Sequence, residues 1–275
     1  MPHAPHRMRY VYHGLNRRWN CVLDSVLRCA APMAKTAGIL LIGNEILSGK
    51  ITDANAAYLC RELRVLGVEV RRITVIPDEV DLIAAEVRAF SAAYDVVFTS
   101  GGVGPTHDDV TIEGVARALD VPVIREPRLV QVLEGYYKGR LNEARLKMAE
   151  VPQGAELTAD GELVFPAVVV RNIYILPGVP EIFRQKFDAL KERFRDAPFH
   201  LCCVYVSMGE GTLADHLNEL LAGHPDLMLG SYPEFSNPEY KVKVTLESKD
   251  RGYLDAAVGS FLDRLPKEAI VRVER

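Results

Sequence analysis

The stretch Thr99–Thr111 reads TSGGVGPTHDDVT and decides the fold of this chain. The apolar run DVVF at 95–98 precedes it and the amphipathic run Ile112–Leu119 follows it, so the order is strand, glycine-rich turn and helix. Three glycines within four residues let the backbone adopt positive φ angles and come close to a ligand. The free amides at the start of the following helix favour anions. The stretch therefore predicts a phosphate-binding turn at the carboxyl end of a buried strand.

Two adjacent carboxylates, Asp108 and Asp109, stand in this anion-attracting turn. Such a pair suits a phosphate site when a divalent cation lies between the carboxylates and the phosphate. We therefore expect Asp108 and Asp109 to bind Mg²⁺, Mn²⁺ or Co²⁺. The alternative is a structural role, in which Thr106 or Asp108 caps the helix and Asp109 or Thr111 bonds back to it. A cap accounts for one acid, but not for two acids together with three glycines.

Composition and charge restrict the class of protein. The chain has 275 residues, of which 48% are hydrophobic and 25% charged, as in an ordinary globular protein. Residues 1–36 hold six Lys or Arg and one acid, which leaves 27 basic and 36 acidic residues, a net charge of −9, in the remainder. So acidic a body predicts no nucleic-acid partner. No apolar run approaches the roughly 20 residues of a membrane helix, so no membrane partner is expected.

The five cysteines form no CxxC pair and no zinc spacing, and their odd number suits a disulfide framework poorly. They predict reduced, buried thiols and a cytoplasmic location.

Strands alternate with amphipathic helices from Ala37 onward, which predicts an α/β domain with a parallel sheet over residues 37–197. Residues 198–275 read strand, helix, strand, strand, helix, strand, which is the ferredoxin-like plan. Residues 1–36 are expected to be a disordered tail, either a transit peptide or residues upstream of a true start at Met33. Edge strands in the smaller domain need covering, so we expect a homo-oligomer, a dimer or a trimer.

Three loops at the carboxyl ends of expected strands form the candidate site, since ligands of open α/β sheets collect on that edge. Besides the glycine turn they are GNEILSG at 43–49, which leads to Asp53, and LPGVPE at 176–181. Asp53 is either a site carboxylate or the N-cap of the helix that begins there. The predicted nucleotide or phosphate contacts are Gly43, Asn44, Glu45, Ser100, Gly101, Gly102, Gly104, Thr106, Thr111, Pro177 and Gly178. Amides, a cation and a carboxylate that activates water suit chemistry at a phosphoanhydride.

These motifs, in this order, resemble the molybdopterin-binding-like domain that the MoaB/Mog and MoeA molybdenum-cofactor proteins share with the CinA family. The matching stretches are GNEIL at 43–47, the glycine turn, residues 148–155 and LPG at 176–178, within a resemblance that covers residues 37–195. Residues 165–178, FPAVVVRNIYILPG, resemble above all the N-terminal domain of eukaryotic-type FAD synthases. Residues 200–275 are similar in plan to the KH-like domain that follows in CinA.

The resemblance implies a three-layer α/β/α domain with a mostly parallel sheet, followed by a small ferredoxin-like or KH-like α+β domain. In the cofactor-synthesis enzymes, aspartates that match Asp53 and Asp109 serve the adenylylation of molybdopterin, so both are expected to be catalytic. In CinA-like and FAD-synthase-like relatives the domain is associated with metal-dependent hydrolysis of nucleotide pyrophosphates such as FAD or ADP-ribose. His107 stands where the family has Lys, and Phe165-Pro166-Ala167 replaces a GTAPG stretch of bacterial CinA, departures that leave the substrate open.

The expected ligand is thus a small-molecule nucleotide or pterin, and the expected activity is that of a divalent-metal-dependent nucleotide pyrophosphohydrolase. Two alternatives stay open: binding or adenylylation of molybdopterin, and a nucleotide-binding module without catalysis.

Overall fold

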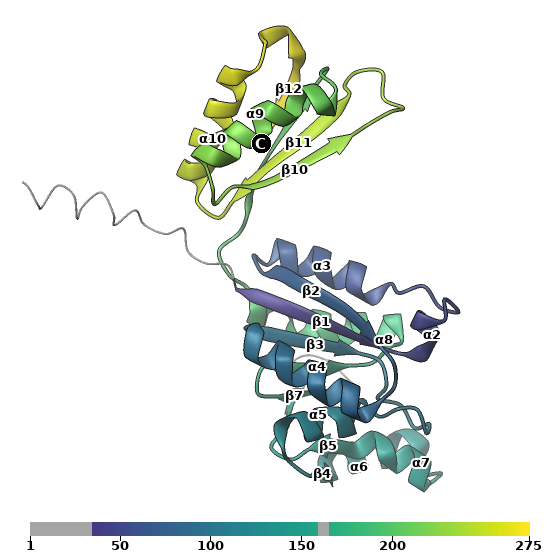
Figure 1. Cartoon of the computed structure of the whole chain (residues 1–275). Helices are drawn as coiled ribbons and strands as arrows, with labels where there is room; N and C mark the ends of the chain where they lie inside the picture. The colour runs from purple at the N-terminus through teal and green to yellow at the C-terminus, as the bar shows by residue number, and fades with distance from the viewer. Residues whose placement is uncertain (1–34, 159–164) are drawn as a thin grey trace, which may run out of the picture. The chain divides into compact units, whose positions relative to one another are not determined.

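The computed structural model describes residues 35–158 and 165–275. The expectations for residues 1–34 lie outside the described residues. Two main sheets organise the described chain (Figure 1). No helix in the described ranges has the length and apolar character needed to span a bilayer.

The first sheet has six strands in the order β2-β1-β3-β8-β7-β6. In chain order they are β1 (Thr36–Ile42), β2 (Glu69–Ile76), β3 (Val96–Ser100), β6 (Glu156–Thr158), β7 (Ala167–Val170) and β8 (Ile173–Leu176). The four strands β2, β1, β3 and β8 are parallel, whereas β7 and β6 add to the sheet in antiparallel pairs. The parallel strands are short apolar runs, as expected where both faces of a sheet are covered.

The strand register brings the carboxyl ends of the parallel strands to one edge. Ile42 pairs with Ile76, Leu41 with Ser100, and Ser100 with Leu176. The loops that begin directly after β1, β2, β3 and β8 therefore start side by side.

Helices cover both faces of this sheet. They are α2 (Asn44–Leu47), α3 (Asn55–Val65), α4 (Val80–Ala93), α5 (Thr111–Leu119), α6 (Pro127–Tyr137), α7 (Glu143–Leu146) and α8 (Pro180–Leu190), with 3₁₀ turns η1 (Lys147–Ala149) and η2 (Lys191–Phe194). A short ladder joins β4 (Val123–Arg125) to β5 (Glu150–Pro152).

Side chains of β1 alternate between the two helical layers. Ile39 and Leu41 pack in the core shared with α3 and α8, while Leu40 and Ile42 pack in the core shared with α4 and α5. All four side chains are buried. This alternation produces the three layers, and it confirms the expected α/β/α class.

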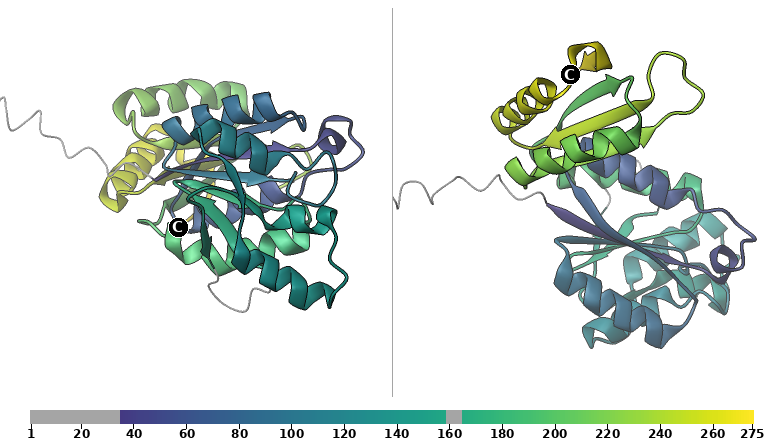
Figure 2. Two further views of the ribbon diagram at one scale, coloured as in Figure 1. Left: turned by 90° about the horizontal axis from the view of Figure 1, so that it is seen from below. Right: turned by 45° about the horizontal axis from the view of Figure 1, so that its top comes forward.

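The second sheet has four antiparallel strands in the order β10-β11-β9-β12. Its elements are β9 (His200–Val206), α9 (Glu210–Gly223), β10 (Met228–Pro233), β11 (Val242–Ser248), α10 (Arg251–Arg264), the turn η3 (Lys267–Ala269) and β12 (Ile270–Glu274). Both long helices contribute to one core with alternate residues of β9 and β11 (Figure 2). The order of elements is the predicted ferredoxin-like plan, and this sheet forms the second, smaller α+β domain.

Candidate ligand-binding cavity

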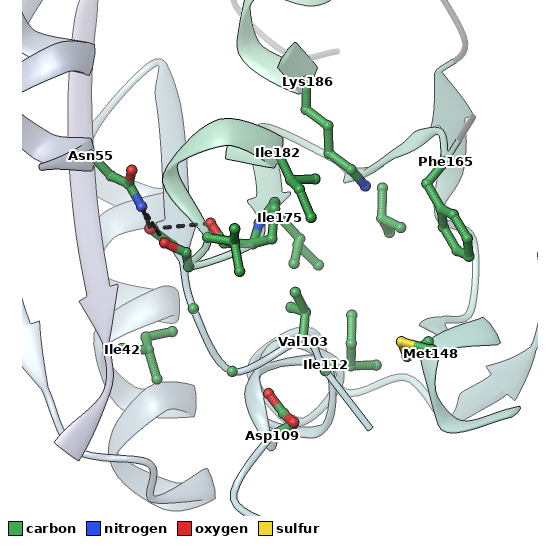
Figure 3. A pocket seen from close by; sticks show the side chains of 18 of the residues that line it. Ile42, Asn55, Val103, Asp109, Ile112, Met148, Phe165, Ile175, Ile182 and Lys186 are labelled. Atoms are coloured by element: carbon green, nitrogen blue, oxygen red, sulfur yellow. Dashed lines mark hydrogen bonds between the residues drawn. The ribbon is translucent and has the colours of Figure 1, made fainter. Parts of the chain in front are cut away.

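A cavity of about 880 Å³ lies at the carboxyl edge of the parallel strands (Figure 3). Its walls come from the loops after β1, β3 and β8, from α5 and α8, and from the segments around α6 and η1. A volume of this size is typical of sites that enclose a small molecule or cofactor.

The cavity brings together nine of the predicted site residues, contributed by all three predicted loops. They are Glu45, Asp53, Ser100, Gly101, Gly102, Gly104, Asp109, Pro177 and Gly178. Five others, Gly43, Asn44, Thr106, Asp108 and Thr111, are described residues that do not line it. Gly43 donates its backbone N–H to the Ile76 carbonyl at 3.1 Å, and Asn44 donates its own to Asp78 Oδ2 at 2.8 Å. These two amides therefore fasten the first loop to the end of β2.

The glycine turn is tied closely to the end of β1 and the start of α5. Gly101 has φ +107°, and a Cβ there would lie 2.1 Å from the carbonyl oxygen of Ile42. The Thr111 hydroxyl is buried and donates to the Gly101 carbonyl at 2.9 Å, while the Thr111 amide donates to the Gly102 carbonyl at 3.0 Å. The two hydrogen bonds of Thr111 thus stabilise the conformation of the turn. The positive φ and the nearby Ile42 carbonyl leave room only for glycine at position 101.

Three consecutive backbone amides of the turn, those of Gly102, Val103 and Gly104, donate no hydrogen bond to any described residue. All three residues line the cavity. Successive unpartnered amides in a glycine-rich turn make a concave site for an anion.

Asp109 closes the outer part of the turn. Its Oδ2 accepts hydrogen bonds from the Thr106 amide at 2.8 Å and from the Thr106 hydroxyl at 2.5 Å. Within the described chain no hydrogen bond is donated to Oδ1, and the residue lines the cavity (Figure 3). The N-cap residue of α5 is Val110, and no side chain forms a capping hydrogen bond there. Neither Thr106 nor Asp108 therefore caps this helix.

Asp53 adopts the capping arrangement that the sequence left as an alternative. Its Oδ1 accepts from the Asn55 amide at 3.1 Å and its Oδ2 from the Ala56 amide at 3.0 Å, which satisfies the start of α3. The residue also lines the cavity.

Asn55 joins the loops that follow β3 and β8. Its Nδ2 donates to the Gly178 carbonyl at 2.8 Å and to Ser100 Oγ at 3.0 Å (Figure 3). The Asn55 residue is 4% exposed, so its bond to Ser100 forms away from water, and the two bonds together join the walls of the cavity.

Four carboxylates gather near this edge of the sheet. Burial is the main cause of the raised pKa of Asp78, the Asn44 amide opposes it, and the negative charges of Glu45, Asp108 and Asp109 raise it further. Among residues 35–158 and 165–275, no three His, Cys, Asp or Glu side chains are grouped closely enough to hold a metal ion. The described carboxylates at this edge therefore form no preformed cage for a metal ion.

Two lysines line the cavity that the sequence did not indicate. Lys147 Nζ donates to the Thr106 carbonyl at 2.6 Å, and Lys186 Nζ donates to the Pro166 carbonyl at 2.8 Å. Burial lowers the pKa of Lys186 to about 8. The His107 side chain is 98% exposed and is not part of the lining. Together these features define an α/β domain with a half-open cavity, one end of which is a glycine-rich turn with unpartnered backbone amides.

Comparisons with known proteins specify the family. The family described as "Probable molybdopterin binding domain" matches residues 38–196, and that described as "FAD synthase, middle domain" matches residues 198–274. The chain belongs to the molybdopterin-binding family, whose match covers more than half of its residues. The match to the FAD synthase middle domain follows directly after it in the sequence.

Relatives of this chain include an archaeal and an animal protein. A protein of Archaeoglobus fulgidus is 38% identical over 227 residues, which are 82% of this chain and 96% of that protein. A "Probable FAD synthase" of Caenorhabditis elegans is 36% identical over 262 residues, and the match covers 85% of this chain but 50% of that protein. The chain thus spans about half the length of the animal relative.

A solved structure supports the fold of the first domain. The CinA protein of Thermoplasma acidophilum, described as having unknown function, is 31% identical with a TM-score of 0.54, over 59% of this chain and all of that one.

Proposed function

We propose that this chain binds a nucleotide pyrophosphate such as FAD or ADP-ribose in the cavity and hydrolyses its phosphoanhydride with the help of a divalent cation. The observation that carries the proposal is the row of unpartnered amides at 102–104, which belong to residues that line the same cavity as Asp109. The diphosphate would lie on these amides, since they supply donors without needing to rearrange.

Asp109 is the carboxylate best placed for a chemical role. Its Oδ2 is held by Thr106 while no described residue donates to Oδ1, so the side chain is oriented with one oxygen left for a ligand or a water. In hydrolysis, water attacks one phosphorus and the P–O–P bridge breaks. The two products are AMP and the phosphate monoester of the other half, which is FMN from FAD or ribose 5-phosphate from ADP-ribose. Asp109 would take the proton of the attacking water. A divalent cation would neutralise charge on the phosphates, and Asp108, an exposed carboxylate next to Asp109 and outside the cavity lining, would help to hold it.

The experiment is product analysis with FAD and ADP-ribose in the presence of Mg²⁺, Mn²⁺ or Co²⁺. We expect AMP release that a chelator abolishes. Asp109→Asn should lower turnover by about 10²-fold or more, because the amide keeps a hydrogen-bond acceptor for Thr106 but cannot take a proton. Asp120→Asn is the matched control: Asp120 is exposed at the end of α5 in a left-handed conformation that Asn tolerates.

Two results would overturn the proposal. One is the absence of AMP from both substrates with each of the three cations. The other is turnover by Asp109→Asn equal to that of Asp120→Asn.

The pterin alternative has support from one comparison, the family description "Probable molybdopterin binding domain" over residues 38–196. Restoration of molybdoenzyme activity in cells that lack a molybdopterin adenylyltransferase would favour it. Tight nucleotide binding without product, unaffected by Asp109→Asn, would instead identify a non-catalytic nucleotide-binding module.

A further inference from the structure

The cavity has two chemically different ends. Asp109 and the free amides of residues 102–104 lie at one end. The rest of the lining is largely apolar and includes Ile112, Met148, Phe165 and Ile182. Lys186 extends from α8 into this apolar part (Figure 3). We call this part of the cavity, which is lined by Ile112, Met148, Phe165, Ile182 and Lys186, the apolar chamber. A diphosphate would occupy the end that holds Asp109 and the free amides. It would leave the apolar chamber empty.

Lys186 is unusual in this chamber because no carboxylate of residues 35–158 or 165–275 forms an ion pair with it. Within these ranges its single hydrogen bond is to the Pro166 carbonyl at 2.8 Å. An ammonium group has three N–H donors and no acceptor. The described residues therefore leave two of these donors for a ligand or solvent.

A purely structural role explains Lys186 poorly. Burial lowers its pKa only to about 8, so the group is still mostly charged at neutral pH. A charge held among apolar side chains without a partner costs stability, and natural proteins keep such groups chiefly where they serve a ligand. An apolar residue at this position of α8 would pack against the same neighbours without that cost.

Building on the proposed function, we propose that Lys186 determines specificity by binding the carbonyl-bearing edge of a planar heteroaromatic ring, of the isoalloxazine or pterin kind, that lies in the apolar chamber. The chemistry of the chamber selects this class. Side chains such as Ile112 and Phe165 offer flat apolar contact to the ring faces, and Lys186 offers only donors to the ring edge. A ring with carbonyl oxygens and ring nitrogens on that edge satisfies both. A cationic ring such as oxidised nicotinamide meets a like charge and is rejected.

The test compares three ligands that share an ADP half. FAD carries an isoalloxazine ring, ADP-ribose carries no second ring, and NAD⁺ carries a cationic one. Binding is measured by titration calorimetry without divalent metal, on the wild-type chain and on Lys186→Met, which keeps the length and apolar body of the side chain. We expect Lys186→Met to bind FAD about 10- to 100-fold more weakly, as for the loss of a charged hydrogen bond. ADP-ribose should bind within about twofold of wild type, and NAD⁺ as tightly or more tightly.

Two further variants sharpen the result. Lys186→Arg keeps the charge and the donors, and it should retain the preference for FAD. Lys147→Met removes the ammonium at the turn end, which contacts the Thr106 carbonyl, and it should weaken FAD and ADP-ribose alike. A loss of FAD binding alone in Lys186→Met, against an equal loss of FAD and ADP-ribose binding in Lys147→Met, would show that the two ends of the cavity bind different parts of the ligand.

Each outcome decides between the two proposals. Equal losses for FAD and ADP-ribose in Lys186→Met, or no loss for either, overturn the role of Lys186 while the proposed function stands. A wild-type chain that binds neither FAD nor ADP-ribose overturns the proposed function and removes the basis of this one.

Discussion

Replacing Lys186 by Met should make the protein more stable, although the change removes a hydrogen bond. The wild-type ammonium belongs to a half-buried side chain without a partner carboxylate in the described chain, and its pKa falls from 10.5 to about 8. At 1.36 kcal/mol for each tenfold change in proton affinity, this corresponds to about 3 kcal/mol of unfavourable free energy at neutral pH. Loss of the hydrogen bond to the Pro166 carbonyl offsets about 1 kcal/mol of it.

The expected net gain in free energy of unfolding is therefore about 2 kcal/mol, or a rise in Tm of about 4–8 °C for a chain of this size. The gain depends on pH with a definite sign. Lys186 has a lower pKa in the folded state than in the unfolded state, so the unfolded state holds more protons between about pH 8 and pH 10.5. Wild-type stability rises across that window, and the advantage of Lys186→Met is full below it and shrinks within it.

The assay is thermal or urea unfolding of the two proteins at about pH 7 and about pH 10. Lys267→Met is the control, because Lys267 is exposed in η3, away from the cavity, and its replacement should change stability by less than about 0.5 kcal/mol. Equal or lower stability of Lys186→Met at pH 7, or a gain that is the same at both pH values, would refute the reasoning.

Two further substitutions test the loops that hold the site. Gly101→Ala should destabilise the protein by more than about 2 kcal/mol and abolish nucleotide binding, since its Cβ would meet the Ile42 carbonyl at 2.1 Å. Gly154→Ala, at φ +85° with no atom within 4 Å, should cost only the conformational strain, about 1 kcal/mol; equal melting temperatures for the two variants would argue against the close approach. Asn55→Ala should cost about 2 kcal/mol in urea unfolding and weaken ADP-ribose binding, because it removes the buried hydrogen bond to Ser100 Oγ together with the one to the Gly178 carbonyl; unchanged affinity would show that this link does not shape the cavity.

The phosphate-binding turn could be predicted because its determinants are local. An apolar strand, three glycines and an amphipathic helix follow one another along the chain, and the parallel sheet then brings Glu45, Ser100 and Gly178 to one cavity. Asp78 was not predicted, although it follows β2 at the same edge of the sheet. Polar residues directly after parallel strands were the signal for the other loops, and the same signal applies to Asp78.

The roles of Thr111 and Lys186 could not be predicted, because they depend on contacts distant in sequence. The Thr111 hydroxyl donates to the carbonyl of Gly101, ten residues earlier, and the direction of that bond follows from the path of the turn. Lys186 lies in an amphipathic helix, where a lysine normally faces solvent. Its half-buried position is due in part to the segment at 165–168, whose Pro166 carbonyl accepts a hydrogen bond from Lys186, and no pattern within the helix indicates this contact.

A crystal structure of the protein with ADP-ribose tests the central claim most directly. We expect the diphosphate to accept hydrogen bonds from the amides of Gly102, Val103 and Gly104 at about 3 Å, beside Asp109 and inside the cavity. A diphosphate bound elsewhere on the protein, with these amides untouched, would contradict the account.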